Sequence, residues 1–502
     1  MFFHKDTPVV RKRQEHCISR KDIDPDALRV LYRLSDAGFT SYLVGGAVRD
    51  LLLGRRPKDF DVGTDARPNE IKRIFRNCFL IGRRFRLAHI RWGQNIIETS
   101  TFRKTPPPPD DPVDTLYQRD DNTFGTPEED ALRRDFTVNG LFYDIKTFDV
   151  IDYVGGLRDL EKKVLRCIGD PNVRFREDPV RMMRAVRLAA VLGFKIDWFS
   201  RFAIKRHYRD IEKASIPRVQ EEVLRLFSRH ASEPAFRLLH ELKLMSLLVP
   251  DVDKYIGASG EEDSPLWKML AAFDADPASE DASNALRLAV LYYPLFRERL
   301  EKAKAASRGR RPNHLNIARE LLKSVSEHLK MPRAAYYGAS AILDAQRRFE
   351  SPASIGPGAF RAEMFDDSLA FFRIRLAADG LSTAPAEELG RRLAQARADA
   401  QPLYSEGVAA IRDSDSPDSP ESPADENLPA SERSDAADGE GDSNSERPFG
   451  RRRRRGGRRH RGRGSRNPRT LPDPEVSGSP FSNDNNHETG NAGNNGAPSK
   501  EQ

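Results

Sequence analysis

One segment, residues 42–64, constrains the fold of this chain more than any other part of its sequence. It reads YLVGGAVRDLLLGRRPKDFDVGT: a strand-like run ends in Gly45 and Gly46, a helical stretch follows, and a second strand-like run carries Asp59 and Asp61. Residues two apart on a strand point to the same face, so both carboxylates lie on one side and the phenylalanine between them faces a core. The segment therefore predicts a strand, a helix and a second strand that meet at an acidic pair.

This acidic pair and the glycine turn together suit a metal-nucleotide complex. A hard cation such as Mg²⁺ is usually held by one or two carboxylates plus substrate phosphates, and this spacing offers Asp59 and Asp61 for that role. The paired glycines let the backbone approach a triphosphate, while Arg49 and Lys58 add positive charge. Two aspartates on a solvent-facing strand edge would look the same, so the pair alone does not establish a site.

Other classes of protein are disfavoured by what the sequence lacks. It contains no GxxxxGK[ST] loop, no GxGxxG fingerprint, no GxSxG elbow and no HExxH pair. Its apolar runs, such as residues 288–296, are far shorter than the roughly 20 residues that cross a bilayer, and the N-terminus has no apolar signal region. The three cysteines are too scattered for a disulfide framework. We expect a cytoplasmic protein.

The organisation along the chain changes twice. Up to about residue 169, short β-rich runs alternate with amphipathic stretches, and after residue 177 the apolar residues recur three and four apart, as in helices. Residues 411–446 carry twelve acidic residues against two arginines, and residues 451–469 carry eleven arginines without a carboxylate. We expect a disordered tail whose arginines bind RNA phosphates, although a solvated tail neutralised by the acidic block is the alternative.

At this point a family resemblance is carried by several motifs in order. GGAVRD and KDFDVGT resemble the polymerase-β nucleotidyltransferase superfamily, and specifically the class II group of bacterial poly(A) polymerases and CCA-adding tRNA nucleotidyltransferases. Residues 132–139 resemble the RRDFTxN motif of that group, residues 152–159 its DxxGGxxD motif, and residues 177–181 its EDxxR motif. The resemblance is strong over residues 18–227 and weak to about residue 400.

The resemblance implies a mixed α+β and α architecture. We expect a polymerase-β-like catalytic head, with a mixed sheet and helices, over residues 18–169. An all-helical neck that binds nucleotide and RNA would follow over 170–250, and an all-helical body over 251–402. The disordered tail would occupy residues 403–502.

Site residues are carried over by position. Asp59 and Asp61 would hold Mg²⁺, and Glu98 would be a third catalytic carboxylate, unless it is only a surface glutamate on an edge strand. The nucleotide-binding residues implied are Gly45, Gly46, Arg49, Lys58, Arg134, Asp135, Asn139, Glu177, Asp178, Arg181 and Arg184.

Three of these assignments have structural alternatives. Arg134 and Asp135 would contact ribose and triphosphate, or form only a salt bridge. Asp178 would read the base edge with Arg181, but an aspartate before a proline also looks like a helix N-cap. Arg184 and Arg187 would face either RNA or solvent, and for Arg187 solvent or packing is favoured.

The choice within the family rests on residues 80–90, LIGRRFRLAHI, which resemble the GRRFxLxH signature of bacterial poly(A) polymerases. His89 in that stretch also reads as a packed core histidine. We therefore expect a template-independent polyadenylating enzyme that adds AMP from ATP to RNA 3′ ends in RNA processing and decay, with RNA-decay proteins as partners. The alternatives are a CCA-adding tRNA nucleotidyltransferase and a non-catalytic RNA-binding protein on the same fold.

Overall fold

The computed structural model describes residues 7–82, 87–104, 123–260, 262–306, 311–349, 355 and 364–413. The chain divides into two compact units, Met1–Pro417 and Asp418–Gln502, and every described residue belongs to the first. The arginine-rich block, almost all of the acidic block, and residues 83–86 of the GRRF stretch lie outside the described residues. The expectations placed there stay predictions.

The N-terminal part is a mixed eight-stranded sheet with the strand order β1-β8-β7-β2-β3-β6-β5-β4. Strands β3 and β6 pair in parallel and the other neighbours pair antiparallel. The strands are β1 (Val9–Arg11), β2 (Ser41–Val44), β3 (Asp61–Thr64), β4 (Cys78–Ile81), β5 (Leu87–Trp92), β6 (Asn95–Thr101), β7 (Leu141–Asp144) and β8 (Val150–Asp152). The expected mixed sheet is confirmed, and β1 lies ahead of residue 18.

A capping aspartate and a proline mark the start of the first helix that accompanies the sheet. Helix α1 (Pro25–Asp36) starts behind Asp24, whose carboxylate accepts the backbone N–H groups of Asp26 and Ala27. Its buried residues, spaced three and four apart, are Ala27, Val30, Leu31 and Leu34. The remaining α-helices of this part are α2 (Gly46–Leu52), α3 (Pro68–Ile74), α4 (Pro127–Arg133) and α5 (Gly156–Glu161), and the 3₁₀ turn η4 (Thr137–Asn139) lies between the last two.

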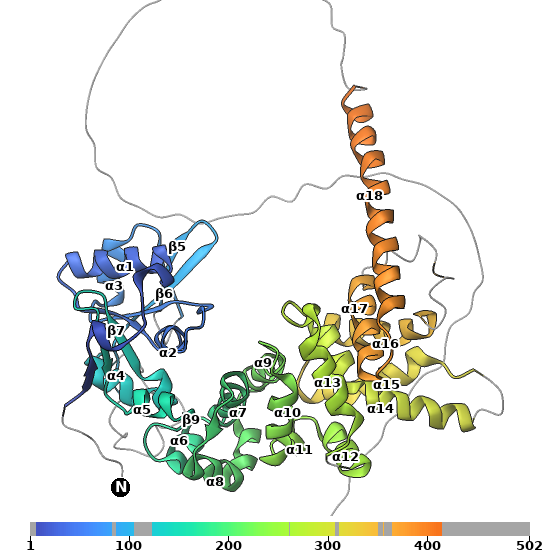
Figure 1. The fold of residues 1–502 in the computed structure, drawn as a ribbon, viewed down its shortest axis with the longest axis horizontal. Helices are drawn as coiled ribbons and strands as arrows, with labels where there is room; N and C mark the ends of the chain where they lie inside the picture. The colour runs from blue at the N-terminus through green and yellow to red at the C-terminus, as the bar shows by residue number, and fades with distance from the viewer. Residues whose placement is uncertain are drawn as a thin grey trace, which may run out of the picture. The chain divides into compact units, whose positions relative to one another are not determined.

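The described chain beyond residue 169 is helical, apart from the short strand β10 (Lys195–Ile196), which pairs in parallel with β9 (Val164–Leu165). Figure 1 shows the sheet in the blue and cyan part of the chain and helices in the green to orange part. These helices are α6 (Pro171–Glu177), α7 (Val180–Leu192), α8 (Trp198–His207), α9 (Ile216–Arg225), α10 (Ser232–Glu241), α11 (Met245–Leu248), α12 (Pro250–Ser259), α13 (Pro265–Ala275), α14 (Asn284–Ala306), α15 (His314–His328), α16 (Arg333–Phe349), α17 (Phe365–Ala378) and α18 (Ala384–Asp413).

Helix α18 continues past residue 402, where the sequence places the end of the body, and the other domain boundaries stay predictions. Among the helices of the described ranges, none is both long and apolar enough to cross a bilayer.

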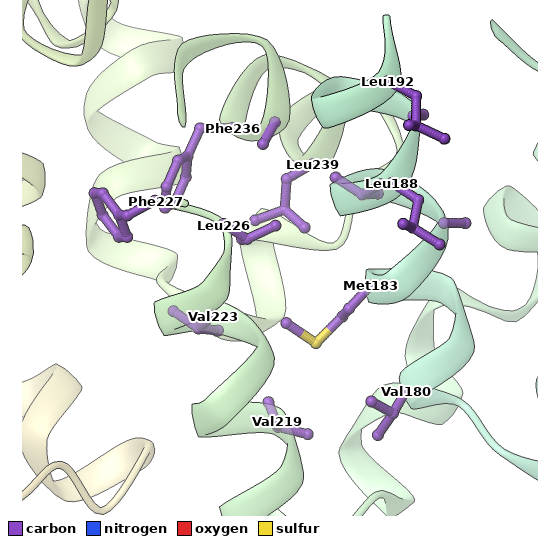
Figure 2. Close-up of a cluster of buried hydrophobic side chains, with 14 of the residues drawn as sticks. Val180, Met183, Leu188, Leu192, Val219, Val223, Leu226, Phe227, Phe236 and Leu239 are labelled. Atoms are coloured by element: carbon purple, nitrogen blue, oxygen red, sulfur yellow. The ribbon is translucent and has the colours of Figure 1, made fainter. Parts of the chain in front are cut away.

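A shared core fixes the helices that carry the site arginines. Figure 2 shows apolar side chains of α7, α9 and α10 in one cluster, with Met183 of α7 reaching toward Val219 and Val223 of α9. Each fully buried side chain of this size stabilises the packing by about 1.5–3 kcal/mol. Because the apolar face of α7 is fixed by this packing, Arg184 and Arg187 are held at the side of the helix that lines a cleft.

Candidate active site

A cleft of about 1160 Å³ opens between the glycine turn of the head and helices α7 and α9. It exceeds a typical small-molecule pocket of about 300–1,000 Å³, so it has room for a nucleotide and a further group. The structure brings together in its walls all but two of the residues proposed from the sequence, namely Gly45, Gly46, Arg49, Lys58, Asp59, Asp61, Arg134, Asp135, Asn139, Asp178, Arg181 and Arg184. Glu98 and Glu177 do not line it.

The two aspartates lie on the same side of the chain, as their spacing predicts. Strand β3 begins at Asp61, so Asp59 lies just ahead of the strand and not within it. Both line the cleft, whereas Phe60 between them packs against the core and lines a separate pocket. Partial desolvation of the carboxylate in the cleft wall, followed by the charges of Glu98 and Asp59, raises the pKa of Asp61 to about 6 against the opposing charge of Arg134.

Glu98 lies beside the acidic pair and not in the cleft wall. Val62 of β3 pairs with Thr99 of β6, which puts Glu98 next to Asp61 across the parallel strands. Its carboxylate is half exposed and lies 3.5 Å from Nε2 of His89, so that histidine is half-buried beside a charge and is not an apolar core residue. Across the described ranges, no three His, Cys, Asp or Glu side chains converge as a set of metal ligands. A third carboxylate role for Glu98 stays a prediction.

The chemistry of the acidic pair fits a hard divalent cation. Asp59 and Asp61 offer carboxylate oxygens, which are the donors that Mg²⁺ prefers. The raised pKa of Asp61 reflects the cost of an ionised carboxylate that is partly desolvated among like charges, and a bound cation would offset that cost.

The glycine turn lies against the arginines of the head. Gly45 has a φ of 71°, and a Cβ placed on it would lie 2.7 Å from Nη1 of Arg134, so this position accepts only glycine without strain. Gly46 begins α2 and has ordinary space around it. Arg49 is buried, with its Nε donating to Asp50 at 2.8 Å and its Nη1 to Oδ1 of Asn139 at 2.5 Å.

Arg134 and Asp135 do not pair with each other. Arg134 donates to Asp130 one turn earlier, at 3.0 and 3.2 Å. Asp135 accepts two hydrogen bonds from Arg184 of α7, at 2.6 and 2.9 Å, and one from the Asn139 amide at 3.0 Å. The salt-bridge alternative is therefore wrong for this pair.

Burial alone would raise the pKa of Asp135, but the charge of Arg184 and the hydrogen bonds outweigh it and lower the pKa to about 2. Asp135 is thus held ionised, linking the head to α7.

The EDxxR motif divides its residues between the cleft and the surface. Asp178 accepts two parallel hydrogen bonds from Arg218 of α9, at 2.8 and 3.0 Å. Helix α7 begins at Val180 with no side-chain cap, so the N-cap interpretation of Asp178 is wrong: its carboxylate is engaged across the cleft instead. Arg181 donates to the backbone oxygen of Arg174 at 3.2 Å.

Glu177 pairs with Arg174 at 3.0 Å and Arg181 at 3.4 Å from outside the cleft. Its contribution to nucleotide binding, which stays a prediction, would act through the position of Arg181.

Sequence reasoning missed the contribution of helix α9. Its Glu222 is only 4% exposed and meets Arg184 at 3.8 Å, Arg187 at 2.9 Å and Arg225 at 3.5 Å. Arg187 therefore packs against a carboxylate. The signal was present in the sequence, because Glu222 lies next to Val223 on the buried side of an amphipathic helix, where an acidic residue requires a partner.

The DxxGGxxD motif supports the site from behind. The carboxylate of Asp152 accepts four backbone N–H groups, from residues 154 to 157, at 2.9–3.0 Å. Asp159 accepts from the hydroxyl of Thr137, in the η4 turn that ends at Asn139. The two aspartates thereby fix the turn that presents Asn139 to the cleft.

Comparison with known proteins places these features in a family. Residues 41–166 match the family described as Poly A polymerase head domain, and residues 193–256 match the one described as Probable RNA and SrmB- binding site of polymerase A. Poly(A) polymerase I of Escherichia coli O6:H1 is 46% identical over 271 residues, covering 52% of this chain and 57% of that protein. The chain thus spans little more than half the length of this relative.

Poly(A) polymerase I of Haemophilus influenzae is 39% identical over 305 residues, which cover 58% of this chain and 67% of that protein. Among solved structures, the Bacillus stearothermophilus CCA-adding enzyme in complex with CTP superposes with a TM-score of 0.57 at 27% identity, over 74% of this chain and 83% of that one. The motif order, the cleft and these matches agree, and the chain belongs to the family of bacterial poly(A) polymerases and CCA-adding tRNA nucleotidyltransferases.

Proposed function

We propose that this protein is a template-independent poly(A) polymerase that adds AMP from ATP to RNA 3′ ends. The observation that carries the proposal is the cleft in which the acidic pair, the glycine turn, Asp178 and Arg181 meet. The sequence identity of 46% and 39% to proteins named Poly(A) polymerase I favours AMP as the nucleotide that is added.

In the proposed reaction, the RNA 3′-oxygen forms a bond to the α-phosphorus of ATP while the bond from that phosphorus to the bridging β-phosphate oxygen breaks. The hydroxyl proton passes to solvent, and pyrophosphate leaves. A divalent cation, which we propose to be Mg²⁺ bound by Asp59 and Asp61, would supply charge stabilisation at the α-phosphate and lower the pKa of the attacking hydroxyl. No covalent enzyme intermediate is required.

The remaining residues of the cleft bind and orient the nucleotide. The glycine turn, Gly45 and Gly46, and the cations Arg49 and Lys58 line the side of the cleft near the acidic pair, where the β- and γ-phosphates would lie. Asn139 is fixed by Arg49 and Asp135, and the remaining N–H of its amide would be the group that contacts the ribose. Most of this catalysis is positioning, which lowers the barrier by holding the reacting groups in line.

Base selection in this proposal depends on Asp178 and Arg181. Adenine presents an amino donor beside a ring nitrogen acceptor, which a carboxylate and a guanidinium match. Cytosine presents the same pair of groups, so these two residues alone do not separate ATP from CTP. The two hydrogen bonds from Arg218 fix the orientation of the Asp178 carboxylate and leave it fewer lone pairs that could accept a hydrogen bond from a base.

The biological setting is part of the same proposal. We place the enzyme in the cytoplasm, where tails on bacterial transcripts would promote exonucleolytic decay, and its three free cysteines suit a reducing compartment. The arginine-rich block 451–469 would add affinity for any RNA by counterion release. RNA-decay proteins are the proposed partners.

The test uses purified full-length protein with Mg²⁺, an unstructured RNA and a tRNA that lacks its terminal CCA, each with ATP, CTP, GTP or UTP alone. Long extension by ATP only, lost in Asp59→Ala/Asp61→Ala, is the expected result. The matched control is Asp36→Ala, an exposed aspartate at the end of α1, which should extend RNA like the wild type.

Two other outcomes refute the proposal in different ways. Incorporation of CTP and then ATP into the tRNA alone identifies a CCA-adding enzyme. No incorporation anywhere, with RNA binding intact in Asp59→Ala/Asp61→Ala, identifies a binding protein on the same fold.

A further inference from the structure

A second cavity lies behind the segment that carries the acidic pair. Its volume is about 580 Å³, within the range of about 300–1,000 Å³ that small-molecule sites occupy. Its walls come from residues 17–25, which lead into α1, and from residues 51–60, which run from the end of α2 to the acidic pair. We call this cavity the rear pocket.

The buried part of the lining is apolar. Ile23 is 3% exposed and Leu51 5%, and both belong to the core of the head. Phe60 adds a partly buried aromatic ring that packs against the same core. A flat ring seated on these side chains would be removed from water together with them, which is favourable.

The exposed part of the lining is charged, with three cations against two carboxylates. Lys21 and Arg56 are both exposed, and neither pairs with a carboxylate in the part of the chain that the structure describes. Arg55 donates to the backbone oxygen of Val191 at 3.0 Å, a neutral acceptor that does not cancel its charge. An anionic group at the mouth of the pocket would meet these cations.

The two carboxylates of the lining do not cancel this charge. Asp24 caps α1, and its Oδ1 accepts two backbone N–H groups of that helix and the amide of Asn95. Asp22 is exposed at the end of a 3₁₀ turn. Because the cations outnumber the carboxylates and one carboxylate is already engaged, the rear pocket favours an anionic ligand.

Two residues link the rear pocket to the candidate active site. Phe60 lines the rear pocket, while Asp59 and Asp61 on either side of it line the cleft. Arg56 lines both cavities, so its guanidinium can pair with an anion in only one of them at a time. A ligand in the rear pocket would therefore contact the segment that holds the acidic pair and withdraw a cation from the cleft.

We propose that the rear pocket is a regulatory site for a small aromatic anion, whose ring packs on the apolar lining while its anionic group pairs with Lys21 and Arg56. Occupancy of this site weakens ATP binding in the cleft, because Arg56 turns toward the rear pocket. The inference rests on the proposed function only for the identity of the nucleotide in the cleft. The binding of an aromatic anion does not depend on catalysis.

Cys17 provides chemical access to the rear pocket. It lines the cavity, its Sγ lies 3.4 Å from the backbone oxygen of Leu51, and it is the exposed member of the three cysteines, since Cys78 and Cys167 are buried. Dithiobis(nitrobenzoate) should therefore react with one thiol of the folded full-length protein. The Cys17 sulfur forms a disulfide bond to one half of the reagent, the disulfide of the reagent breaks, the thiol proton passes to solvent, and thionitrobenzoate leaves. The attached half carries an aromatic ring and a carboxylate into the pocket.

Two further reagents modify the same thiol and serve as matched controls. Methyl methanethiosulfonate attaches only a methylthio group, and dithiodipyridine attaches a ring without a charge. The nitrobenzoate adduct should melt about 2 °C or more above the methylthio adduct, with the pyridyl adduct between them. Lys21→Ala should at least halve the difference between the two ring adducts. Lys146→Ala, which changes an exposed lysine of the head outside the rear pocket, should leave that difference unchanged.

The regulatory effect is measured by equilibrium dialysis of ATP with Mg²⁺. The Kd for ATP should rise about fivefold or more in the nitrobenzoate adduct, and dithiothreitol should restore it. The methylthio adduct and Cys17→Ser should bind ATP like the wild type, because neither fills the pocket.

Free benzoate and AMP, each at millimolar concentration, distinguish a carboxylate from a phosphate as the anionic group of the ligand. The one that occupies the rear pocket should slow the reaction of Cys17 with methyl methanethiosulfonate, and Lys21→Ala should reduce this protection. Protection by neither anion overturns the proposal.

Two further results also overturn it: equal melting temperatures of the nitrobenzoate and methylthio adducts, or an equal Kd for ATP in these two adducts. The polymerase proposal fails separately, because a chain that shows the expected adduct stabilities and ATP affinities but adds no AMP refutes only the enzyme.

Discussion

The buried pair of Asp135 and Arg184 makes a prediction about stability that can be worked from the structure. Asp135→Asn keeps the size of the side chain and removes its charge. Arg184, whose side chain is 33% exposed, would retain only Glu222 at 3.8 Å, and that carboxylate already serves Arg187 and Arg225. Breaking a buried pair generally costs about 3–5 kcal/mol, and the remaining contact to Glu222 favours the lower end, about 3 kcal/mol.

The pH dependence of that loss gives the sharper measurement. The folded pKa of Asp135 is lowered from 3.8 to about 2, so the group stabilises the fold above its unfolded pKa and loses that contribution as pH falls through about 2. This pKa shift contributes about 2 kcal/mol to the free energy of unfolding at neutral pH, and about half of that contribution remains at pH 3. The advantage of the wild type over Asp135→Asn should therefore stay constant between about pH 5 and 8 and decline toward pH 3.

The assay is thermal unfolding of both proteins across that pH range, with Asp366→Asn as the matched control. Asp366 forms a two-pronged ion pair with Arg397, but both side chains are more than half exposed, so its loss should cost under about 1 kcal/mol. Equal stability of the wild type and Asp135→Asn at neutral pH, or a difference that does not decline below pH 4, would refute the reasoning.

Three further changes test other contacts of the site. Gly45→Ala should lower the free energy of unfolding by about 2 kcal/mol, because Gly45 has a positive φ and a guanidinium approaches it closely. Gly46→Ala should lower it by less than about 0.5 kcal/mol, and thermal unfolding of the two variants tests the difference. Asp152→Asn should cost about 2 kcal/mol, since its amide would point an N–H at a backbone donor, and an unchanged melting temperature would contradict this. Arg218→Met should reduce the ratio of kcat/KM for ATP to that for CTP by freeing the Asp178 carboxylate, which single-nucleotide incorporation kinetics measure.

The parts of the fold that local signals determine were predictable. Helix α1 followed from an aspartate cap, a proline at the first position and apolar residues at helical spacing, all within residues 24–36. Strand β1, Val9–Arg11, was not predictable in the same way, because a three-residue edge strand is defined by its pairing with β8 and not by its own sequence.

The candidate site residues differ in the same way, because some depend on local sequence and others on distant partners. Asp59 and Asp61 were found because their spacing on one short segment determines which way they face. The partners of Asp135 and Asp178 were not, because Arg184 and Arg218 lie 49 and 40 residues away along the chain. Among 83 lysines and arginines, sequence alone offers no means of choosing the partner, which depends on how α7 and α9 pack.

These long-range pairs also set an order of events during synthesis. Asp135 belongs to the head, but its partner Arg184 is synthesised 49 residues later. Glu222, which pairs with the neighbouring Arg187, is synthesised 35 residues after Arg187. At about 5–20 residues per second, translation of this stretch takes several seconds. The head therefore cannot complete the proposed nucleotide-binding cleft while it is itself being made. A nascent chain should become able to retain ATP only after α9 has left the ribosome.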